Sequence, residues 1–148
     1  MIANADIVMV GGGNTANMLA IWRLHSVERA LRDAYASGAV MTGWSAGCLC
    51  WFECGITDSF TPELGPLNDG LGILKGSACP HYDADERRPL VYRREIAAGM
   101  APGVALDDGV AASYEDERLV EIVSGRPDGR AFRLSRGGEE PLTVRLLS

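Results

Sequence analysis

The sequence lacks a long apolar run, a surplus of basic residues and a secretory signal. No apolar segment approaches the ~20 residues that a membrane-spanning helix needs. The 14 lysines and arginines are outnumbered by 20 aspartates and glutamates, and the net charge of −6 leaves no basic face for the phosphates of a nucleic acid. Met1–Gly13 has neither a basic start nor a cleavage-like site. We therefore expect a cytoplasmic protein that binds neither membranes nor nucleic acid.

Histidine is scarce, and the cysteines are unevenly placed. The chain has two histidines, His25 and His81, and three of its four cysteines are Cys48, Cys50 and Cys54. This spacing is not the C-x-x-C pair of a zinc ribbon, and neither histidine lies beside it. A C-x-C-x-x-x-C metal site is the alternative to buried apolar thiols along a helix, and the sequence favours the thiols. Without a secretory signal, a disulfide framework is not expected.

The composition is that of a folded globular protein. The chain of 148 residues is long enough to bury a core, and its 47% hydrophobic and 23% charged residues are ordinary values. There is no internal repeat and no low-complexity segment. We therefore expect residues 1–148 to form a single domain.

Strand and helix patterns alternate in the first third of the chain. An apolar run ends at three glycines, and either Asn14 or Thr15 can then cap a helix in which apolar residues recur at helical spacing. Ser26 can cap a second helix within that stretch. The expected strands are Asp6–Val10 and Ala39–Thr42, and the next expected helix is Ala46–Cys54, stopped by Gly55. This alternation predicts the βαβ arrangement of a parallel sheet.

The rest of the chain changes from loop and helix to short strands. Thr57–Gly72 is expected to be a surface loop, Ile73–Cys79 a strand, and a helix begins near Asp85 with Pro89 in its first turn. The segment Arg126–Gly129 is a hairpin signal. The sequence thus predicts an α/β fold with a mostly parallel sheet, flanking helices and antiparallel C-terminal strands. The late strands are expected at Val104–Leu106, Val110–Tyr114, Leu119–Val123, Ala131–Leu134 and Leu142–Leu147.

The pentapeptide Gly43–Gly47, GWSAG, matches the pattern G-x-S-x-G. A nucleophile on a sharp turn between a strand and a helix needs unusual backbone dihedrals, and flanking glycines let the chain segments pass closely. The helix N-terminus behind it supplies N–H groups for an oxyanion. Ser45 can instead be a small residue at a packing contact. The apolar strand before it and the apolar segment after it favour the nucleophile.

A serine nucleophile needs a base, and the two histidines differ in their context. His25 sits inside the expected amphipathic helical stretch, which favours a surface or helix-break role. His81 follows an expected strand, at the carboxyl end where α/β sheets place their sites. We therefore expect His81 to be the base.

Four aspartates are candidates for the acid that would hold His81 in the correct tautomer. The candidates before His81 are Asp58 and Asp69, and those after it are Asp107 and Asp108. Asp69 lies in PLNDGLG and is explained by turn chemistry. The adjacent pair at 107 and 108 lies at the end of an expected strand, which favours a functional role.

Four short motifs occur in the order VGGGNT, GWSAG, PHY and LDDG. Together they resemble the peptidase E (aspartyl dipeptidase) family of serine peptidases, to which cyanophycinase is related. The resemblance covers the chain from Ile7 to about Leu134 and implies the class I glutamine-amidotransferase-like, flavodoxin-like α/β fold. It implies a peptidase that cleaves dipeptides with an amino-terminal aspartate and needs no metal or other cofactor.

The resemblance also implies roles for individual residues. The nucleophile of the family corresponds to Ser45 and its histidine to His81. The acid is usually the glutamate of a Leu-Pro-Glu-Gly motif, and that position is Asp108 here, with Asp107 as the alternative acid. The oxyanion hole is expected from the N–H groups of Gly12, Gly13 and Ala46.

In the family, an arginine shortly after the histidine reads the aspartate side chain of the substrate. Bidentate pairing of guanidinium and carboxylate explains such selectivity. Arg88 and Arg87 are the nearest matches here, and Asn14 of VGGGNT is a further candidate for substrate binding. The alternative for both arginines is solvated charge at the start of a helix.

Members of the family carry further βα units before the VGGGNT strand, and this chain begins only six residues ahead of it. The resemblance therefore implies an open sheet edge or an uncovered face at Asp6–Val10 or a neighbouring strand, which we expect a homodimer to cover.

Two other functions stay open. One is a catalytically weak amidotransferase-like binding or oligomerisation module. The other is an esterase with the order Ser–Asp–His, which would assign the acid role to Asp58 or Asp69.

Overall fold

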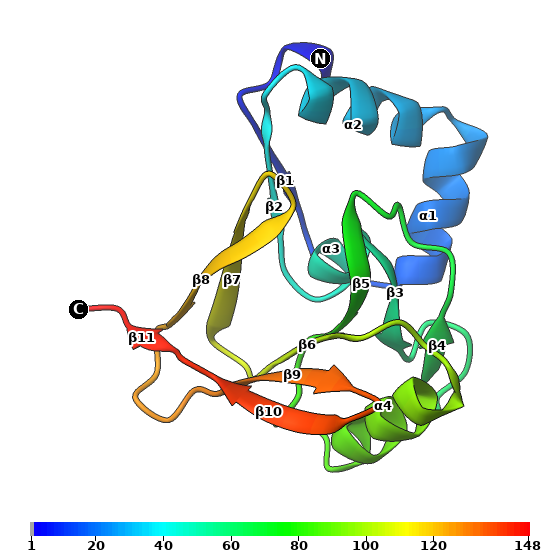
Figure 1. The fold of residues 1–148 in the computed structure, drawn as a ribbon. Coiled ribbons are helices and arrows are strands. Elements are labelled where there is room, and N and C mark those ends of the chain that lie inside the picture. Colours follow the sequence, from blue (N-terminus) through cyan, green and yellow to red (C-terminus); the bar gives the residue numbers. More distant parts are fainter. Residues whose placement is uncertain (1) are drawn as a thin grey trace.

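Strands and helices alternate over the first two thirds of the chain, and strands alone follow at its end (Figure 1). The computed structural model describes residues 2–148. The helices are the 3-10 helix η1 (Ile2–Asn4), α1 (Thr15–Leu24), α2 (Val27–Ala36), α3 (Ala46–Leu49) and α4 (Arg87–Ala98). The strands are β1 (Ile7–Val10), β2 (Val40–Gly43), β3 (Phe52–Thr57), β4 (Gly65–Leu67), β5 (Leu74–Cys79), β6 (Gly103–Leu106), β7 (Val110–Glu115), β8 (Arg118–Ser124), β9 (Ala131–Ser135), β10 (Gly138–Leu142) and β11 (Arg145–Leu146).

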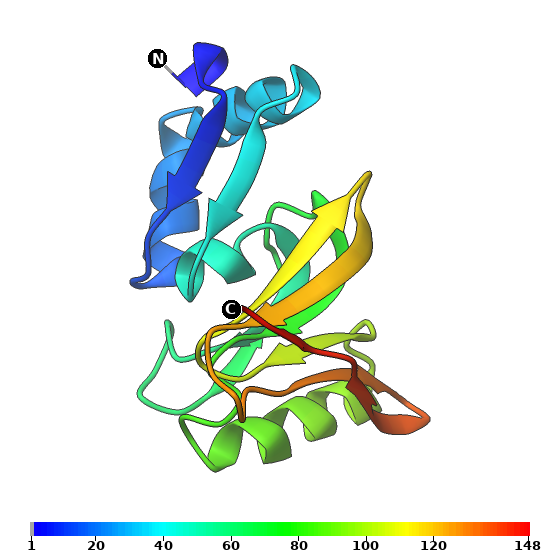
Figure 2. The ribbon, with the colours of Figure 1, turned by 90° about the vertical axis from the view of Figure 1, so that its left-hand side faces the viewer.

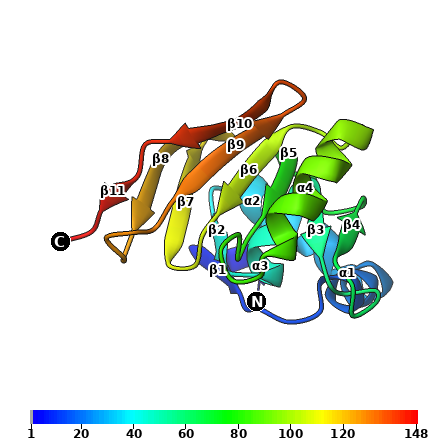
Figure 3. The same cartoon turned by 90° about the horizontal axis from the view of Figure 1, so that it is seen from below.

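The strands form three sheets, the largest of which has the order β10-β9-β6-β5-β3-β4 (Figure 3). Its central strands β3, β5 and β6 run in parallel, whereas β4, β9 and β10 each pair antiparallel to their neighbours. β1 and β2 form a parallel pair of their own, and β11, β8 and β7 form the third sheet. The α/β class with flanking helices and antiparallel C-terminal strands is therefore confirmed.

The helices bury apolar side chains against the strands. α1 and α2 contribute Leu19 and Leu31 to a cluster that also contains Leu49 and Phe52. α4 lies along the six-stranded sheet (Figure 3) and contributes side chains to a second cluster with residues of β3, β5, β6 and β9. Within it the hydroxyl groups of Tyr92 and Ser77 form a buried hydrogen bond of 2.7 Å. Burial of a large apolar side chain in either cluster is worth about 1.5–3 kcal/mol, and the sum of these contributions holds the sheet and helices together.

The expected break in the first helical stretch is confirmed, but its mechanism differs. Of the two expected caps of α1, Asn14 is the one that caps it, since its side-chain oxygen accepts from the N–H of Asn17 at 2.8 Å. Ser26 separates the two helices with a left-handed backbone, φ 59°, and its side chain makes no capping hydrogen bond. Ser26 therefore occupies the expected N-cap position of α2, but the expected capping by its side chain is wrong. No helix among residues 2–148 combines the length and the apolarity that crossing a membrane requires.

The helix expected over Ala46–Cys54 is wrong beyond its first turn. α3 ends at Leu49, and the chain enters β3 at Phe52. Gly55 does not stop a helix; it lies within β3, where a Cβ would stand 2.1 Å from the carbonyl oxygen of Ala78 on β5. The apolar run is the signature of a buried strand, which periodicity alone does not separate from a helix.

Three expectations for the later segments also need correction. Arg126–Gly129 forms a turn, closed by a 3.3 Å hydrogen bond, but it connects β8 and β9, which belong to different sheets. It is therefore not a hairpin; consecutive strands pair antiparallel in β3–β4, β7–β8 and β9–β10. Thr57–Gly72 is not all loop, because it contains β4. The strand expected over Leu142–Leu147 is divided between the end of β10 and the short strand β11.

β1 and β2 lie beside the helices α1 and α2 (Figure 2), and both strands carry exposed apolar side chains. Ile7 and Met9 of β1 are 62% and 67% exposed, and Val40 of β2 is 60% exposed. This is the surface that the expected homodimer would cover, and that association stays a prediction.

Candidate active site

Ser45 lies on a sharp turn between β2 and α3. The strand ends at Gly43 and the helix begins at Ala46, so only two residues make the connection. Ser45 has φ 56° and ψ −118°, a backbone conformation that non-glycine residues rarely adopt. Such strain persists only where the surroundings impose it, and it is typical of functional positions. The turn has the geometry expected for a nucleophile elbow.

The glycines on both sides of Ser45 are required by close backbone contacts. A Cβ on Gly47 would stand 2.1 Å from the carbonyl oxygen of Val10, at the end of β1. A Cβ on Gly43 would stand 2.5 Å from the carbonyl oxygen of Gly47. The elbow therefore lies directly on the end of β1, and no larger residue fits at either position.

The glycine loop after β1 runs beside the elbow. A Cβ on Gly12 would stand 3.3 Å from the Cβ of Ser45, so the backbone of this loop borders the serine. Among residues 2–148, no protein acceptor pairs with the backbone N–H of Gly12, Gly13 or Ala46. These three donors are those expected for an oxyanion hole. Gly12 lies beside Ser45 in space, and Ala46 follows Ser45 in the sequence.

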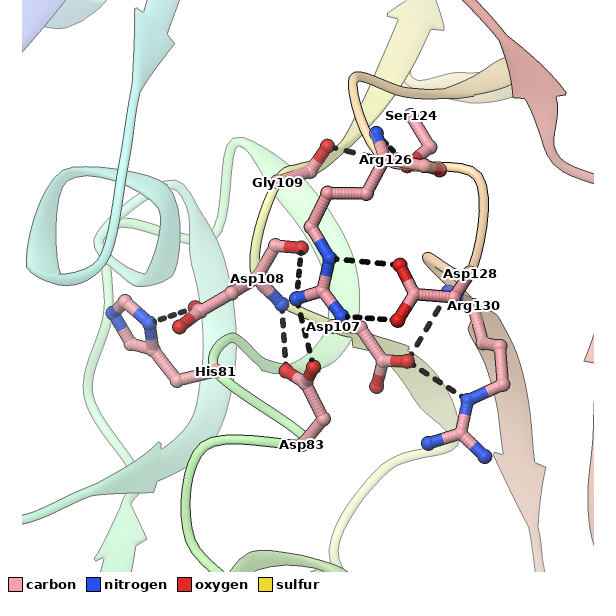
Figure 4. Close-up of polar contacts among 9 residues, drawn as sticks. All are labelled: His81, Asp83, Asp107, Asp108, Gly109, Ser124, Arg126, Asp128 and Arg130. Atoms are coloured by element: carbon pink, nitrogen blue, oxygen red, sulfur yellow. Dashed lines mark hydrogen bonds and ion pairs between the residues drawn. The ribbon is translucent and has the colours of Figure 1, made fainter.

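His81 and Asp108 meet at the carboxyl edge of the six-stranded sheet. β5 ends two residues before His81, and the neighbouring parallel strand β6 ends two residues before Asp108. The distance between His81 Nδ1 and Asp108 Oδ1 is 2.5 Å (Figure 4). The second ring nitrogen points away from the carboxylate (Figure 4). His81 is thus oriented by a carboxylate, as a general base must be.

The adjacent aspartate has a different partner. Asp107 Oδ2 accepts hydrogen bonds from the backbone N–H and the Nε of Arg130, at 3.1 and 2.9 Å. Its side chain is 1% exposed, whereas that of Asp108 is 49% exposed. The structure therefore brings Asp108, and not Asp107, to His81.

The remaining candidates of the triad lie elsewhere. Asp69 pairs with Arg23 at 2.6 Å, and His25 is the exposed C-cap residue of α1. Asp58 borders the recess that contains Ser45 and His81, but none of the hydrogen bonds among residues 2–148 joins it to His81. The arrangement that the esterase alternative requires is absent from the described part of the chain.

Arg88 lies in the same recess as Ser45 and His81. It is only 9% exposed, and no carboxylate among residues 2–148 forms an ion pair with it. Arg87 is instead exposed and pairs with Asp85 at 2.6 Å. A buried guanidinium without an anionic partner is costly, and an anionic ligand would offset that cost.

Asn14, the remaining candidate for substrate binding, is held by the fold. Its side-chain oxygen caps α1, and its amide nitrogen donates to the carbonyl oxygen of Ser59 at 2.8 Å. Both ends of the amide are therefore engaged. Asn14 joins the glycine loop to the segment after β3, and the structure gives it a positioning role.

A cavity of about 790 Å³ opens beside the same residues. It lies between β2 and β7 and is bordered by Trp44, Ser45 and His81. Cavities of ~300–1,000 Å³ hold small ligands, so the volume suffices for a short peptide.

The four cysteines are buried or half-buried free thiols. Burial raises the pKa of Cys48 to about 11 and that of Cys79 to about 12, which keeps both thiols neutral. Cys54 lies in β3 rather than in a helix, which corrects the expected placement. Residues 2–148 contain no group of three histidine, cysteine, aspartate or glutamate side chains arranged to hold a metal ion.

Two residues near the triad were missed from the sequence. Asp83 accepts a hydrogen bond from the backbone N–H of Asp108, and Arg126 donates to the carbonyl oxygen of Asp108 (Figure 4). In the sequence, the only indication of a role for Asp83 is that it follows His81 by two positions. Arg126 carried none, because its segment was interpreted only as a turn.

Comparison with known proteins identifies the family. The model of Peptidase family S51 matches residues 1–122. The chain belongs to Peptidase family S51. This confirms the resemblance to peptidase E, which rested on four short motifs.

The relatives of this S51 chain include proteins from several bacteria. It is 39% identical to "Uncharacterized peptidase YgaJ" of Bacillus subtilis, over 99% of this chain and 65% of that protein. It is 34% identical to "Peptidase E" of Escherichia coli O1:K1 / APEC, over 92% of this chain and 55% of that protein. It is 26% identical to "Peptidase E" of Shewanella denitrificans, over 97% of this chain and 63% of that protein. The S51 chain thus spans less than two thirds of the length of these relatives.

The contact between the elbow and β1 predicts a large effect of Gly47→Ala. The added methyl group would overlap the backbone of Val10, so we expect the free energy of unfolding to fall by about 1–3 kcal/mol or more. Urea unfolding measures this change. Gly65→Ala is the matched control, because no heavy atom lies within 4 Å of the added Cβ, and a change within ~0.5 kcal/mol is expected. Equal stability of the two variants would contradict the close contact.

Proposed function

We propose that this chain is a serine peptidase that hydrolyses short peptides, with dipeptides that carry an amino-terminal aspartate as its preferred substrates. Ser45, His81 and Asp108 form its triad. The observation that carries the proposal is the 2.5 Å contact of His81 with Asp108, in a chain of family S51 whose Ser45 borders the same recess on a strained turn.

In the proposed reaction, Ser45 Oγ attacks the peptide carbonyl carbon while His81 Nε2 accepts the hydroxyl proton. The oxygen of the tetrahedral intermediate accepts hydrogen bonds from the N–H groups of Gly12, Gly13 and Ala46. His81 then donates its proton to the leaving amine, and the peptide C–N bond breaks to leave an acyl-enzyme. Water, deprotonated by His81, attacks the ester, and collapse of the second intermediate releases the acid and restores Ser45.

Asp108 serves the reaction through His81. Its carboxylate accepts from Nδ1–H, which places the lone pair of the imidazole on Nε2 and stabilises the imidazolium that forms during proton transfer. Charge-assisted hydrogen bonds of this kind are roughly twice as strong as neutral ones.

Arg88 supports the proposed preference for an acidic side chain. The residue is only 9% exposed, it lines the recess beside Ser45 and His81, and no carboxylate among residues 2–148 forms an ion pair with it. An aspartate side chain of the substrate would supply that partner by bidentate pairing. Arg87 is engaged by Asp85 and is not needed for this role.

The nucleophile is tested with Ser45→Ala. We expect hydrolysis of an aspartyl dipeptide to fall about 10³-fold or more, and a fluorophosphonate to label the parent but not the variant, as measured by intact mass. Ser113→Ala is the matched control, because Ser113 borders the same cavity without belonging to the triad. A parent that takes up no fluorophosphonate would instead favour the binding module.

The assignment of the acid is tested by comparing Asp108→Asn with Asp107→Asn. Asp108→Asn is expected to lower kcat by about 10²–10⁴-fold with little loss of stability, because it removes the acceptor for His81 Nδ1–H. Asp107→Asn is expected to lower the free energy of unfolding by about 1–3 kcal/mol, because it removes the charge opposite Arg130. Steady-state kinetics and urea unfolding separate the two effects, and the reverse pattern would reassign the acid.

The role of Arg88 is tested with Arg88→Gln. Loss of a buried charge partner costs about 2–5 kcal/mol, so we expect kcat/KM for an aspartyl dipeptide to fall more than ~10-fold. The value for an alanyl dipeptide should change little, since it offers no carboxylate side chain. Arg87→Gln, at the neighbouring exposed position, is expected to leave both values unchanged. Equal losses on the two substrates would exclude Arg88 as the selective contact.

A further inference from the structure

The backbone of Asp108 is held from both sides. Its N–H donates to Asp83 Oδ1 at 2.7 Å, and its carbonyl oxygen accepts from Arg126 Nη1 at 3.1 Å (Figure 4). The same Nη1 lies 3.0 Å from Asp83 Oδ2, so the two side chains are joined to each other. Asp83 thus binds the peptide group before Asp108, and Arg126 binds the peptide group after it. We call this pair the Asp83–Arg126 clamp.

The guanidinium of the clamp is itself fixed. Asp128 accepts two hydrogen bonds from it, from Nε at 3.1 Å and from Nη2 at 3.0 Å. The loop that carries Arg126 is bound to the turn after Asp108, because the N–H of Gly125 donates to the carbonyl oxygen of Gly109 at 3.0 Å. The buried hydroxyl of Ser124 adds a 2.7 Å hydrogen bond to the carbonyl oxygen of Arg126. The clamp is therefore anchored in the fold on the side of Arg126.

The turn that presents Asp108 is shaped to fit the clamp. The N–H of Val110 donates to the carbonyl oxygen of Asp107 at 3.2 Å, which closes a tight turn with Gly109 at φ 75°. A glycine is favoured at this φ. A Cβ at position 109 would also stand 3.0 Å from the Cδ of Arg126, so the stem of the arginine packs on the space that glycine leaves.

The clamp sets the position of the carboxylate that meets His81. An aspartate carboxyl group has only two rotatable bonds to the backbone, so its reach depends directly on where the backbone lies. Burial would raise the pKa of Asp83, but hydrogen bonds from the Asp108 N–H and from Arg126 outweigh this and lower it. Asp83 therefore stays an ionised acceptor at neutral pH, and its charge is balanced by Arg126.

We propose that Asp83 and Arg126 are positioning residues, which hold the Asp108 carboxylate in hydrogen-bonding contact with His81 by fixing the backbone of Asp108. The proposal rests on the proposed function, because it explains how the acid of the triad is placed. Neither residue touches the reacting atoms.

The test uses the imidazole proton rather than catalysis as its first readout. A proton on Nδ1 that is hydrogen-bonded to a carboxylate gives a far-downfield resonance in ¹H NMR. With ¹⁵N-labelled histidine, the chain gives ring signals from His25 and His81 alone, and exposed His25 serves as an internal reference. We expect the downfield signal in the parent and its loss in Asp108→Asn.

Asp83→Ala and Arg126→Gln are the decisive variants. Each is expected to shift the His81 signal upfield and broaden it, although neither residue touches His81. Arg145→Gln is the matched control, since it breaks an exposed pair with Glu121, 2.6 Å in length, away from the triad. If either decisive variant does not fold, Asp83→Asn and Arg126→Lys take its place; each keeps part of the clamp and is expected to shift the signal less.

The outcomes separate this inference from the function it rests on. A downfield signal in the parent that is unchanged in the folded clamp variants would overturn the clamp and leave the triad intact. A parent without the signal would overturn the His81–Asp108 contact and the clamp with it. Kinetics provide the second readout: misplacement of a catalytic group costs about 10–10²-fold, and we expect this loss in kcat with KM unchanged. A loss confined to KM would also contradict a positioning role.

Discussion

The backbone of residue 47 passes the end of β1 so closely that no side chain fits between them. A Cβ on Gly47 would stand 2.1 Å from the carbonyl oxygen of Val10. This contact places the start of α3 on the end of β1, and it forces the connecting Ser45 into a strained conformation. It also places the glycine loop that follows β1 beside the serine. The proposed nucleophile and its expected oxyanion donors therefore depend on one steric constraint.

The other half of the site depends on the parallel pairing of β5 and β6. Neighbouring parallel strands end at the same edge of a sheet, so the residues that follow them meet there. Asp107 follows β6 directly, whereas Asp108 lies in the tight turn that comes next, so the two adjacent aspartates have different partners. Asp107 turns into the fold to meet Arg130, and Asp108 turns toward His81. Hydrogen bonds to the backbone of Asp108 then set how far its short side chain reaches.

Buried charges lie both in the recess and beside the proposed triad. Asp107 is buried with a cationic partner, as buried charges generally are. Arg88 is buried without a carboxylate partner among residues 2–148, although exposed Arg87 beside it has one. Buried guanidinium groups are rare without an anion, which is why this contrast between neighbouring arginines bears on the substrate.

Much of this site was accessible from residue types and their order. The elbow glycines, the single histidine in a suitable context and the LDDG motif were visible, because each is defined by a few adjacent residues. The helix expected over Ala46–Cys54 failed because an apolar run shows burial but not the partner that buries it. The expected hairpin at Arg126–Gly129 failed for a related reason. Turn residues determine that the chain reverses, whereas the strands that pair afterwards are chosen by packing.

The sequence by itself determined the α/β class, the position of the nucleophile elbow and the family, since these depend on local conformation and on the order of motifs. Only the tertiary structure showed that Asp108 contacts His81 while Asp107 contacts Arg130, and that Arg88 lines the recess while Arg87 pairs with Asp85. It also brought a loop residue 18 positions away onto the backbone of Asp108. These choices depend on which groups are buried together. Such contacts join residues far apart in the chain, and no local pattern of residues encodes them.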